Sequence, residues 1–289
     1  MDFDSQVKIR SVVWLLACGL CILHNKKKVG KQKMKMTKSN PLFSSAIIPH
    51  GNGKLTDYDN PETGEKFRYA QFNTRAILDC PFRSKGCEAV CYATKGNHQF
   101  PSVKESRSRS FEESKRDDFT KRMAYTIRYH LTTKRFNGTT MIIRIHESGD
   151  FYSVQYLKKW VKIWKSMKDE PVLFVFYTKS FQFFLMLTEE EKNIIRRMMK
   201  ALKLAMNLSI DDTTSKRQKM AYLDMLKEFP LANTYRVTET ATDSDDKCDC
   251  ADCAKCGACN KATGKEKVVE IHSASNADKE IYRNNTGRD

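Results

Sequence analysis

Cysteine spacing constrains this chain more than any other feature of its sequence. Eight of the ten cysteines lie in two short segments, which hold Cys80, Cys87 and Cys91 and, further along, Cys248, Cys250, Cys253, Cys256 and Cys259. Disulfide frameworks are typical of short secreted chains, whereas thiols crowded into two loops of a 289-residue chain are typical of metal or iron–sulfur ligation. We therefore predict a metalloprotein from a reducing compartment.

The two cysteine segments offer different sets of ligands. Three thiolates from the first loop can hold three corners of a metal cluster and leave a fourth position open to a small molecule. A closed zinc site is the alternative, because His98 or His146 could supply a fourth ligand. The second segment carries more thiolates than one tetrahedral zinc can use, so it indicates metal binding without deciding between zinc and a cluster.

The charge balance of the chain points to anionic partners. The formal net charge is +16, of which residues 1–35 contribute +6. A strongly basic chain favours a nucleotide or nucleic acid as partner, although basic surfaces can also be solubilising. The apolar run at residues 12–23 is flanked by basic residues but is too short to span a membrane, so we expect no stable membrane association. Export or membrane contact through this run is the alternative.

Residues 1–35 are expected to be a poorly structured extension or the product of a misassigned start, because a second start at Met34 or Met36 would come just before a polar stretch. Residues 36–289 are then expected to form one α/β domain. A cysteine-rich metal-binding insertion is expected within it, at about residues 243–261.

Alternating strand-like and helix-like segments predict the fold of that domain. Strands are expected at residues 68–77, 140–145, 172–177, 204–210, 233–237 and 267–271, and helices at 102–131 (one or two), 154–167, 189–203 and 215–229. Strands that alternate with helices form a parallel sheet, because parallel neighbours need a crossover connection. These units predict a partial (β/α)6-type parallel barrel, followed by the C-terminal cysteine-rich loop.

Functional side chains gather where the predicted strands end, at residues 146–150, 177–180 and 209–212. The carboxyl ends of parallel strands form the crevice in which such folds bind ligands. We expect His146 and Glu147 to act as catalytic acid or base groups there, and Lys179 to bind an anionic group. The alternatives are a hydrogen-bonded structural histidine and a solvated lysine.

Several motifs occur in the order found in the phage gene product 88 family, which this chain resembles over about residues 39–273. They are Asn40-Pro41, Cys80-Pro81, Gly86-Cys87, Cys91-Tyr92-Ala93, the run from Arg144 to Phe151, the run from Tyr177 to Ser180, and the C-terminal cysteine segment. The resemblance implies a cytoplasmic location, in a bacterial host.

A looser resemblance is to radical S-adenosylmethionine enzymes, in which a cysteine loop ending in Cys-Tyr follows the first strand of a partial (β/α)6 barrel. It implies that Cys80, Cys87 and Cys91 hold a four-iron four-sulfur cluster whose open iron binds S-adenosylmethionine. It also implies an auxiliary cluster on the C-terminal cysteines. The spacing here is Cys-x6-Cys-x3-Cys, whereas the usual spacing in that superfamily is Cys-x3-Cys-x2-Cys.

The same resemblance implies a set of cofactor-binding residues at the strand ends. Ser148, Gly149 and Asp150 would receive the methionyl amino group, while Asp211, with Ser209 on the same strand, would meet the ribose. We therefore expect an iron–sulfur protein with radical chemistry on a nucleotide-related or nucleic-acid-related substrate. The competing expectation is a non-catalytic zinc protein that binds nucleic acid through Lys and Arg, with both cysteine loops stabilising its fold.

Overall fold

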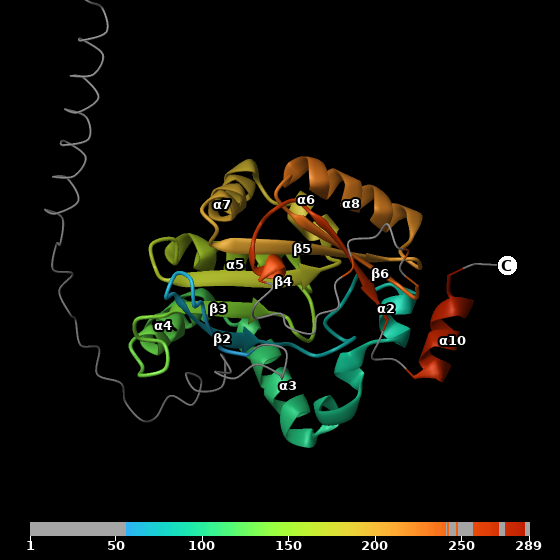
Figure 1. Cartoon of the computed structure of the whole chain (residues 1–289), viewed down its shortest axis with the longest axis horizontal. Helices are drawn as coiled ribbons and strands as arrows, with labels where there is room; N and C mark the ends of the chain where they lie inside the picture. Colours follow the sequence, from blue (N-terminus) through green and yellow to red (C-terminus); the bar gives the residue numbers. More distant parts are fainter. Residues whose placement is uncertain (1–55, 241, 243–246, 248–256, 272–274, 287–289) are drawn as a thin grey trace, which may run out of the picture. The chain divides into compact units, whose positions relative to one another are not determined.

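The computed structural model describes residues 56–240, 242, 247, 257–271 and 275–286 (Figure 1). The chain divides into two units, residues 1–40 and residues 41–289, and all the described residues belong to the second. The expected extension at residues 1–35 and most of the expected insertion at residues 243–261 lie outside the described residues. Within the described part, no helix has the length and apolar character needed to cross a membrane.

One curled sheet of seven strands forms the centre of the described unit. Its strands, in spatial order, are β1 (Tyr58–Asp59), β2 (Lys66–Phe72), β3 (Thr140–Ile145), β4 (Val172–Thr178), β5 (Leu204–Asp211), β6 (Asn233–Thr238) and β7 (Glu266–Glu270). Strand β1 pairs antiparallel with β2, and every later strand runs parallel to the one before it. The sheet forms a half-barrel, so the predicted α/β architecture with a partial parallel barrel is confirmed.

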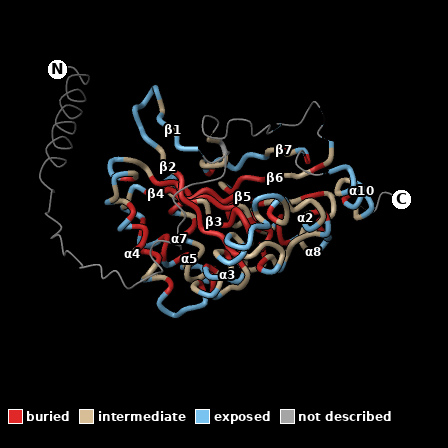
Figure 2. The backbone as a smooth tube through the Cα atoms, turned by 90° about the horizontal axis from the view of Figure 1, so that it is seen from below, coloured by how far each residue is buried: buried red, intermediate tan, exposed pale blue. Residues whose placement is uncertain are grey.

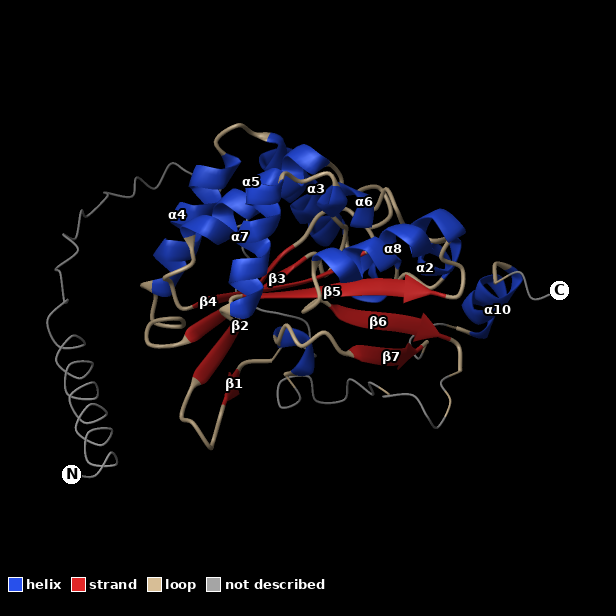
Figure 3. Cartoon of the chain, turned by 90° about the horizontal axis from the view of Figure 1, so that it is seen from above, coloured by secondary structure: helices blue, strands red, loops and turns tan. Residues whose placement is uncertain are grey.

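Most of the helices cover one face of the sheet, called here the helix face (Figure 3). The α-helices are α2 (Lys85–Ala89), α3 (Pro101–Lys115), α4 (Phe119–Leu131), α5 (Val154–Ser166), α6 (Phe181–Leu185), α7 (Glu189–Lys200), α8 (Lys216–Glu228) and α10 (Asn276–Asn284), the last of which follows β7. The 3-10 helices are η1 (Tyr92–Thr94), η2 (Gly96–Gln99) and η3 (Ala258–Asn260), and η3 lies on the opposite face of the sheet. Most of the β6–β7 connection lies outside the described residues, so the (β/α)6 type stays a prediction.

Helix starts follow local capping rules. The side chains of Ser153, Thr188 and Ser215 each accept a backbone N–H from the first turn of α5, α7 and α8. These bonds satisfy donors that have no partner within the helix, so the sequence fixes where each crossover helix begins. The expected long helix at residues 102–131 is two helices, α3 and α4, with a break at residues 116–118.

The main hydrophobic core lies between the sheet and the helices, and Figure 2 shows the central strands as mostly buried, in contrast to β1 and β7 at the edges. Strand residues such as Ile143 and Phe176 belong to this core, and the Phe176 ring stacks on Trp164 of α5. The opposite face, called here the open face, has a smaller cluster that includes Ile142 and Val175. Apolar residues on both faces explain why the strands read as nearly continuous hydrophobic runs.

The expectation that the first parallel strand reaches Ile77 is wrong, because β2 ends at Phe72. The Asn73 side chain leaves the strand pattern and accepts the backbone N–H of Glu147 at 2.8 Å. Ile77 has a positive φ of 65°, which a β-branched residue rarely adopts. The apolar residues Ile77 and Leu78 therefore belong to the turn that leads into the cysteine loop, and not to the sheet.

Candidate functional site

The cysteine loop is held at the carboxyl ends of the strands by contacts of Asp79, the residue before Cys80. Asp79, which is almost fully buried, accepts hydrogen bonds from the backbone N–H and the guanidinium of Arg75, each at 2.7 Å. The carbonyl oxygen of Asp79 accepts the N–H of Asp150 at 3.1 Å. The residue before the first cysteine is thus fixed to the loop that follows β3.

The second cysteine lies in α2, whose start is set by the hydroxyl of Ser84. That oxygen accepts the backbone N–H of Cys87 at 3.1 Å. Gly86 lies beneath Tyr282 of α10, and a Cβ added there would stand 2.5 Å from the tyrosine ring. Only glycine allows this close approach of α2 and α10. The helix that carries Cys87 is therefore positioned by its cap and by a distant part of the chain.

All three thiols of the loop have a raised pKa. Burial raises the pKa of Cys80, of Cys91 and of Cys87, the last to about 11. Negative charge on Cys87 or Cys91 raises the pKa of Cys80 further. None of the three forms a disulfide. Without a bound cation the thiols therefore stay protonated at neutral pH.

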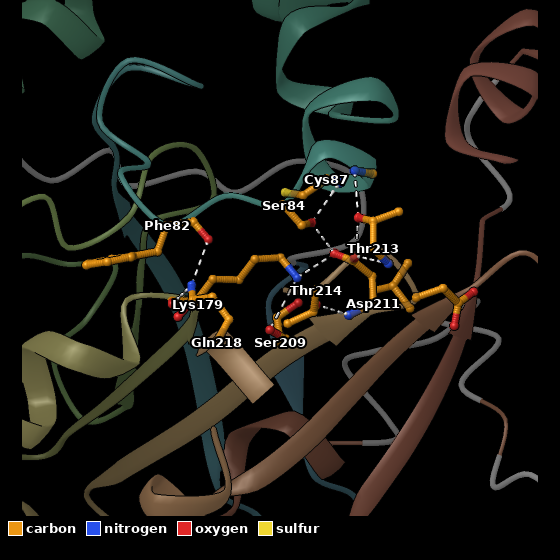
Figure 4. Close-up of polar contacts among 12 residues, drawn as sticks. Phe82, Ser84, Cys87, Lys179, Ser209, Asp211, Thr213, Thr214 and Gln218 are labelled. Carbon is orange, nitrogen blue, oxygen red and sulfur yellow. Dashed lines mark hydrogen bonds and ion pairs between the residues drawn. The ribbon is translucent and has the colours of Figure 1, made fainter. Parts of the chain in front are cut away.

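Polar side chains from three strand ends form a connected network beside this loop (Figure 4). The carboxylate of Asp150 accepts the backbone N–H of Lys179 at 2.9 Å, and the ammonium of Lys179 donates to Asp211 at 2.7 Å. Asp211 in turn accepts the hydroxyl of Ser84, the cap of α2. The network thus reaches from the end of β3 to the cysteine loop.

The acid groups of this network have opposite pKa shifts. Burial raises the pKa of Asp150 to about 6, although hydrogen bonds from Lys179, Thr178 and Phe151 partly offset the effect. Burial acts on Asp211 in the same direction, but the charge and hydrogen bond of Lys179 outweigh it and leave the pKa of Asp211 below its usual value. Asp211 is therefore ionised at neutral pH and paired with Lys179.

Charged groups of this network also shift the pKa of Cys87. After burial, the largest influence on the pKa of Cys87 is the positive charge of Lys179, which lowers it, while Asp211 and Asp150 raise it. The structure therefore brings together six residues that the sequence singled out, namely Cys80, Cys87, Cys91, Asp150, Lys179 and Asp211. Ser209 joins them through its carbonyl oxygen, which accepts from the Lys179 ammonium at 3.2 Å.

In the segment before Asp150, the backbone lies close to Thr74. Gly149 has a φ of +85°, and a Cβ there would lie 2.0 Å from Oγ1 of Thr74. The hydroxyl of Ser148 donates to the carbonyl oxygen of Thr74 at 2.9 Å. Ser148 and Gly149 therefore join the ends of β2 and β3, and the glycine is required by its neighbours as well as by its conformation.

The side chains of His146 and Glu147, the two residues before Ser148, have different surroundings. The imidazole of His146 is buried against Phe151 and hydrogen bonds to the hydroxyl of Tyr156 at 2.9 Å, in the core of the helix face. The carboxylate of Glu147 accepts from the side chain of Asn73 at 3.3 Å, and its carbonyl oxygen accepts the hydroxyl of Tyr92. The placement of His146 favours a structural role, and the catalytic role of either residue stays a prediction.

His146 gives a pH-dependent contribution to stability. Burial lowers its pKa from 6.5 to about 3, so below pH 6.5 the unfolded chain binds the proton more readily than the folded one. This contribution is complete above pH 6.5 and is lost as the pH falls toward 3. At pH 5 we expect this loss to lower the free energy of unfolding by about 2 kcal/mol relative to its value above pH 6.5.

The change His146→Asn tests this expectation, because asparagine tolerates a positive φ but does not titrate; His146 has φ 63°. Urea unfolding of both proteins at pH 7.5 and pH 5 gives the comparison, in which groups common to both proteins cancel. The stability difference between wild type and variant should shrink by about 2 kcal/mol at pH 5. An unchanged difference would contradict the buried neutral histidine.

Only the end of the second cysteine segment falls among the described residues. Cys259 lies in η3 on the open face, where its thiol hydrogen bonds to the hydroxyl of Tyr235 and its carbonyl oxygen accepts from Asn207 at 3.2 Å. Its charge is also among the influences that raise the pKa of Tyr177. Cys248, Cys250, Cys253 and Cys256 lie outside the described residues, so a metal site there stays a prediction.

Several residues of the site were missed from the sequence. Ser84 and Thr213 both bond Asp211, and Tyr282 packs on Gly86 from a helix that was not expected. A signal for that helix is present, because Ser275 and Asp278 form a capping box at its start. Ser84, three residues before Cys87, is a similar cap signal.

A family model described as Gene product 88 matches residues 41–267 of this chain, which is most of its length. The matched range holds the cysteine loop, all the strand-end residues of the network and the second cysteine segment. No curated protein matches the chain, and no solved structure matches it.

Proposed function

We propose a function for this chain, which belongs to the gene product 88 family. It holds a four-iron four-sulfur cluster on Cys80, Cys87 and Cys91 in a (β/α)6-type half-barrel, and it performs radical S-adenosylmethionine-like chemistry on a nucleotide-related substrate. The observation that carries the proposal is the position of the three thiols. They come from one loop at the carboxyl ends of parallel strands, and the pKa values of Cys80 and Cys87 are both raised by Cys91 and by Asp150.

The chemistry of the donor set suits a cluster. Three thiolates from one loop are the ligands of a cluster that keeps one iron open. A cluster binds each thiolate to a different iron. Its positive iron charge would also offset the burial that raises the thiol pKa values.

When bound, such a cluster supplies one electron for the reductive cleavage of S-adenosylmethionine. The chain would bind and orient that molecule with its strand-end groups. In this proposal Asp150 meets the ligand's ammonium group through its charge, while its carboxylate accepts the N–H groups of Phe151 and Lys179 and the hydroxyl of Thr178. The hydroxyl of Ser209, which has no partner among the described residues, remains for a ligand hydroxyl.

Asp211 has a positioning role in this proposal. Its two carboxylate oxygens accept four hydrogen bonds, from Lys179, from Ser84 and from the backbone and side chain of Thr213. A carboxylate has about four acceptor positions, so none is left for a ribose hydroxyl. Asp211 instead holds Lys179 and the cap of α2 in place beside Cys87.

Metal analysis of the full chain tests the proposal. Anaerobic protein should contain iron and sulfide in equal amounts with a broad absorbance near ~400 nm. The triple change of Cys80, Cys87 and Cys91 to Ala should remove the iron of this site. The change Cys21→Ala is the matched control, because Cys21 belongs to neither cysteine segment, and it should leave the iron content unaltered.

Further variants separate this cluster from a second one. Changing Cys248, Cys250, Cys253, Cys256 and Cys259 to Ala should remove only the auxiliary cluster. Reduced wild-type protein should then release 5′-deoxyadenosine from S-adenosylmethionine, while the triple variant should not. Iron without this release would remove the radical chemistry and leave the iron–sulfur assignment.

The net charge of +16 favours a second candidate, a zinc-stabilised protein that binds nucleic acid. It predicts zinc in place of iron after reconstitution, and an affinity for oligonucleotides that falls steeply with salt. Stoichiometric zinc with no iron would overturn the radical-enzyme proposal in favour of this one.

A further inference from the structure

A cavity of about 220 Å³ lies next to the cysteine loop, where three segments of the chain meet. Its walls are residues 82–85 of that loop, Lys179 and Phe181 at the start of α6, and residues 213–215 with Gln218 at the start of α8 (Figure 4). Pockets that enclose a whole drug-sized ligand measure about 300–1,000 Å³. This cavity is therefore sized for one end of a ligand.

The charge of the cavity wall is one-sided. Arg83, Lys85 and Lys179 line it, and no carboxylate does. Arg83 forms an ion pair at 2.8 Å with Glu88 of α2, a residue that does not line the cavity. Lys85 is exposed and forms no ion pair with any described residue. The wall thus has a cation that the described protein does not neutralise.

Buried hydrogen-bond donors line the same cavity. Lys179 is 8% exposed, and its ammonium donates to Asp211 and to the carbonyl oxygen of Ser209, which leaves one of three N–H groups. Thr214 is 7% exposed, and its oxygen accepts the N–H of Asp211 at 2.9 Å, which leaves the hydroxyl hydrogen to donate. Both donors are almost fully buried, and a buried donor without a hydrogen-bond acceptor lowers the stability of the protein.

We propose that this cavity binds the phosphoryl group of a small phosphorylated molecule, such as a nucleoside monophosphate. Phosphate oxygens accept several hydrogen bonds and carry the charge that Lys85 and the remaining Lys179 donor would meet. The first backbone N–H groups of α8, which begins at the cavity, add further donors. The inference gives the nucleotide-related substrate of the proposed function a place for its phosphate.

The position of the cavity directs the rest of such a ligand toward the thiols. Ser84 lines the cavity and also caps the helix that carries Cys87. Lys179 lines it too, and it donates to Asp211, which accepts the hydroxyl of Ser84. A phosphate bound in this cavity would therefore lie beside the cysteine loop. The rest of the same nucleotide could then extend toward the thiols.

Titration of the full chain with inorganic phosphate and with nucleoside monophosphates, by calorimetry at low salt, tests the proposal. Lys85→Glu should weaken phosphate binding by about tenfold or more, since a hydrogen bond to a charged group contributes roughly that factor. Lys219→Glu, an exposed residue of α8 outside the cavity wall, is the matched control. It makes the same charge change and should leave the affinity within about twofold.

Three outcomes would overturn the inference. They are no phosphate binding by the wild type, an equal loss in both variants, and tight binding of an oligonucleotide with which a mononucleotide does not compete. The last would point to a polynucleotide surface in place of a phosphate cavity. Unphosphorylated nucleosides should bind more weakly than their monophosphates.

Phosphate binding and iron binding are separate readouts. The variant with Ala at Cys80, Cys87 and Cys91 should lose iron but keep its affinity for phosphate, because none of the three thiols lines the cavity. Failure of the iron analysis would therefore leave the phosphate inference standing, and failure of the phosphate titration would leave the cluster proposal standing.

Discussion

Replacing Lys179 with methionine is expected to lower the free energy of unfolding by about 3–5 kcal/mol, because removing one partner of a buried ion pair leaves the other charge uncompensated. The side chains of Lys179 and Asp211 are 10% and 2% exposed, and their charged atoms lie 2.7 Å apart. Asp211 also holds Ser84, so the loss should loosen the start of α2 and with it Cys87.

A double-mutant cycle measures the pair itself. Urea unfolding of Lys179→Met, Asp211→Asn and the double variant should show that the double variant is more stable than the two single losses predict, since neither charge is then left alone. Lys165→Met is the control, because Lys165 and its partner Glu190 are 59% and 76% exposed. That change should cost less than about 1 kcal/mol. Additive losses in the cycle would show that the buried pair is not coupled.

Gly149→Ala is expected to destabilise the protein by at least about 3 kcal/mol, because two effects act at one position. The positive φ of +85° strains any residue with a Cβ, and that Cβ would stand 2.0 Å from Oγ1 and 3.1 Å from Cβ of Thr74. Thr74 is fully buried, so its side chain cannot move out into solvent to make room. The ends of β2 and β3 should therefore separate and displace Asp150 from Lys179.

Gly64 provides a matched control for the conformational part of this effect. It has a similar φ of +70°, but nothing lies within 4 Å of an added Cβ. Gly64→Ala should therefore cost only about 1 kcal/mol. Thermal unfolding compares the two variants, and the further change Thr74→Ala should recover part of the loss at Gly149 by removing Oγ1. Equal losses at both glycines would mean that strain alone, and not the contact with Thr74, sets the cost.

Periodicity predicted the repeating part of the fold well. Strand β3 has the expected bounds, and strands β4 to β7 and helices α5, α7 and α8 lie within a few residues of theirs. Each has one consistent pattern, and the three helices also begin after a capping residue. The short elements were missed. Helix α6 has five residues, and its buried Phe181 and Phe184 read only as an apolar run. A pattern shorter than two turns carries too little signal to show a period.

The parts of the candidate site that follow from strand order could be predicted from the sequence. The parts that follow from individual side-chain contacts could not. Parallel strands bring their carboxyl ends to one edge, so the proximity of Asp150, Lys179 and Asp211 follows from strand order alone. The orientation of His146 does not, because a φ of 63° turns its side chain toward Tyr156. The saturation of Asp211 by Ser84 and Thr213 is likewise set by side-chain geometry that no spacing encodes.

The contact between α2 and α10 sets an order of events during synthesis. Each strand of the sheet pairs with its neighbour in the sequence, so the sheet can grow as the chain emerges. The packing of Tyr282 on Gly86 joins residues almost two hundred positions apart and must come later. We expect the cysteine loop to be the last part of the site to reach its native packing. Until then, its thiols are open to oxidants and to unsuitable metal ions.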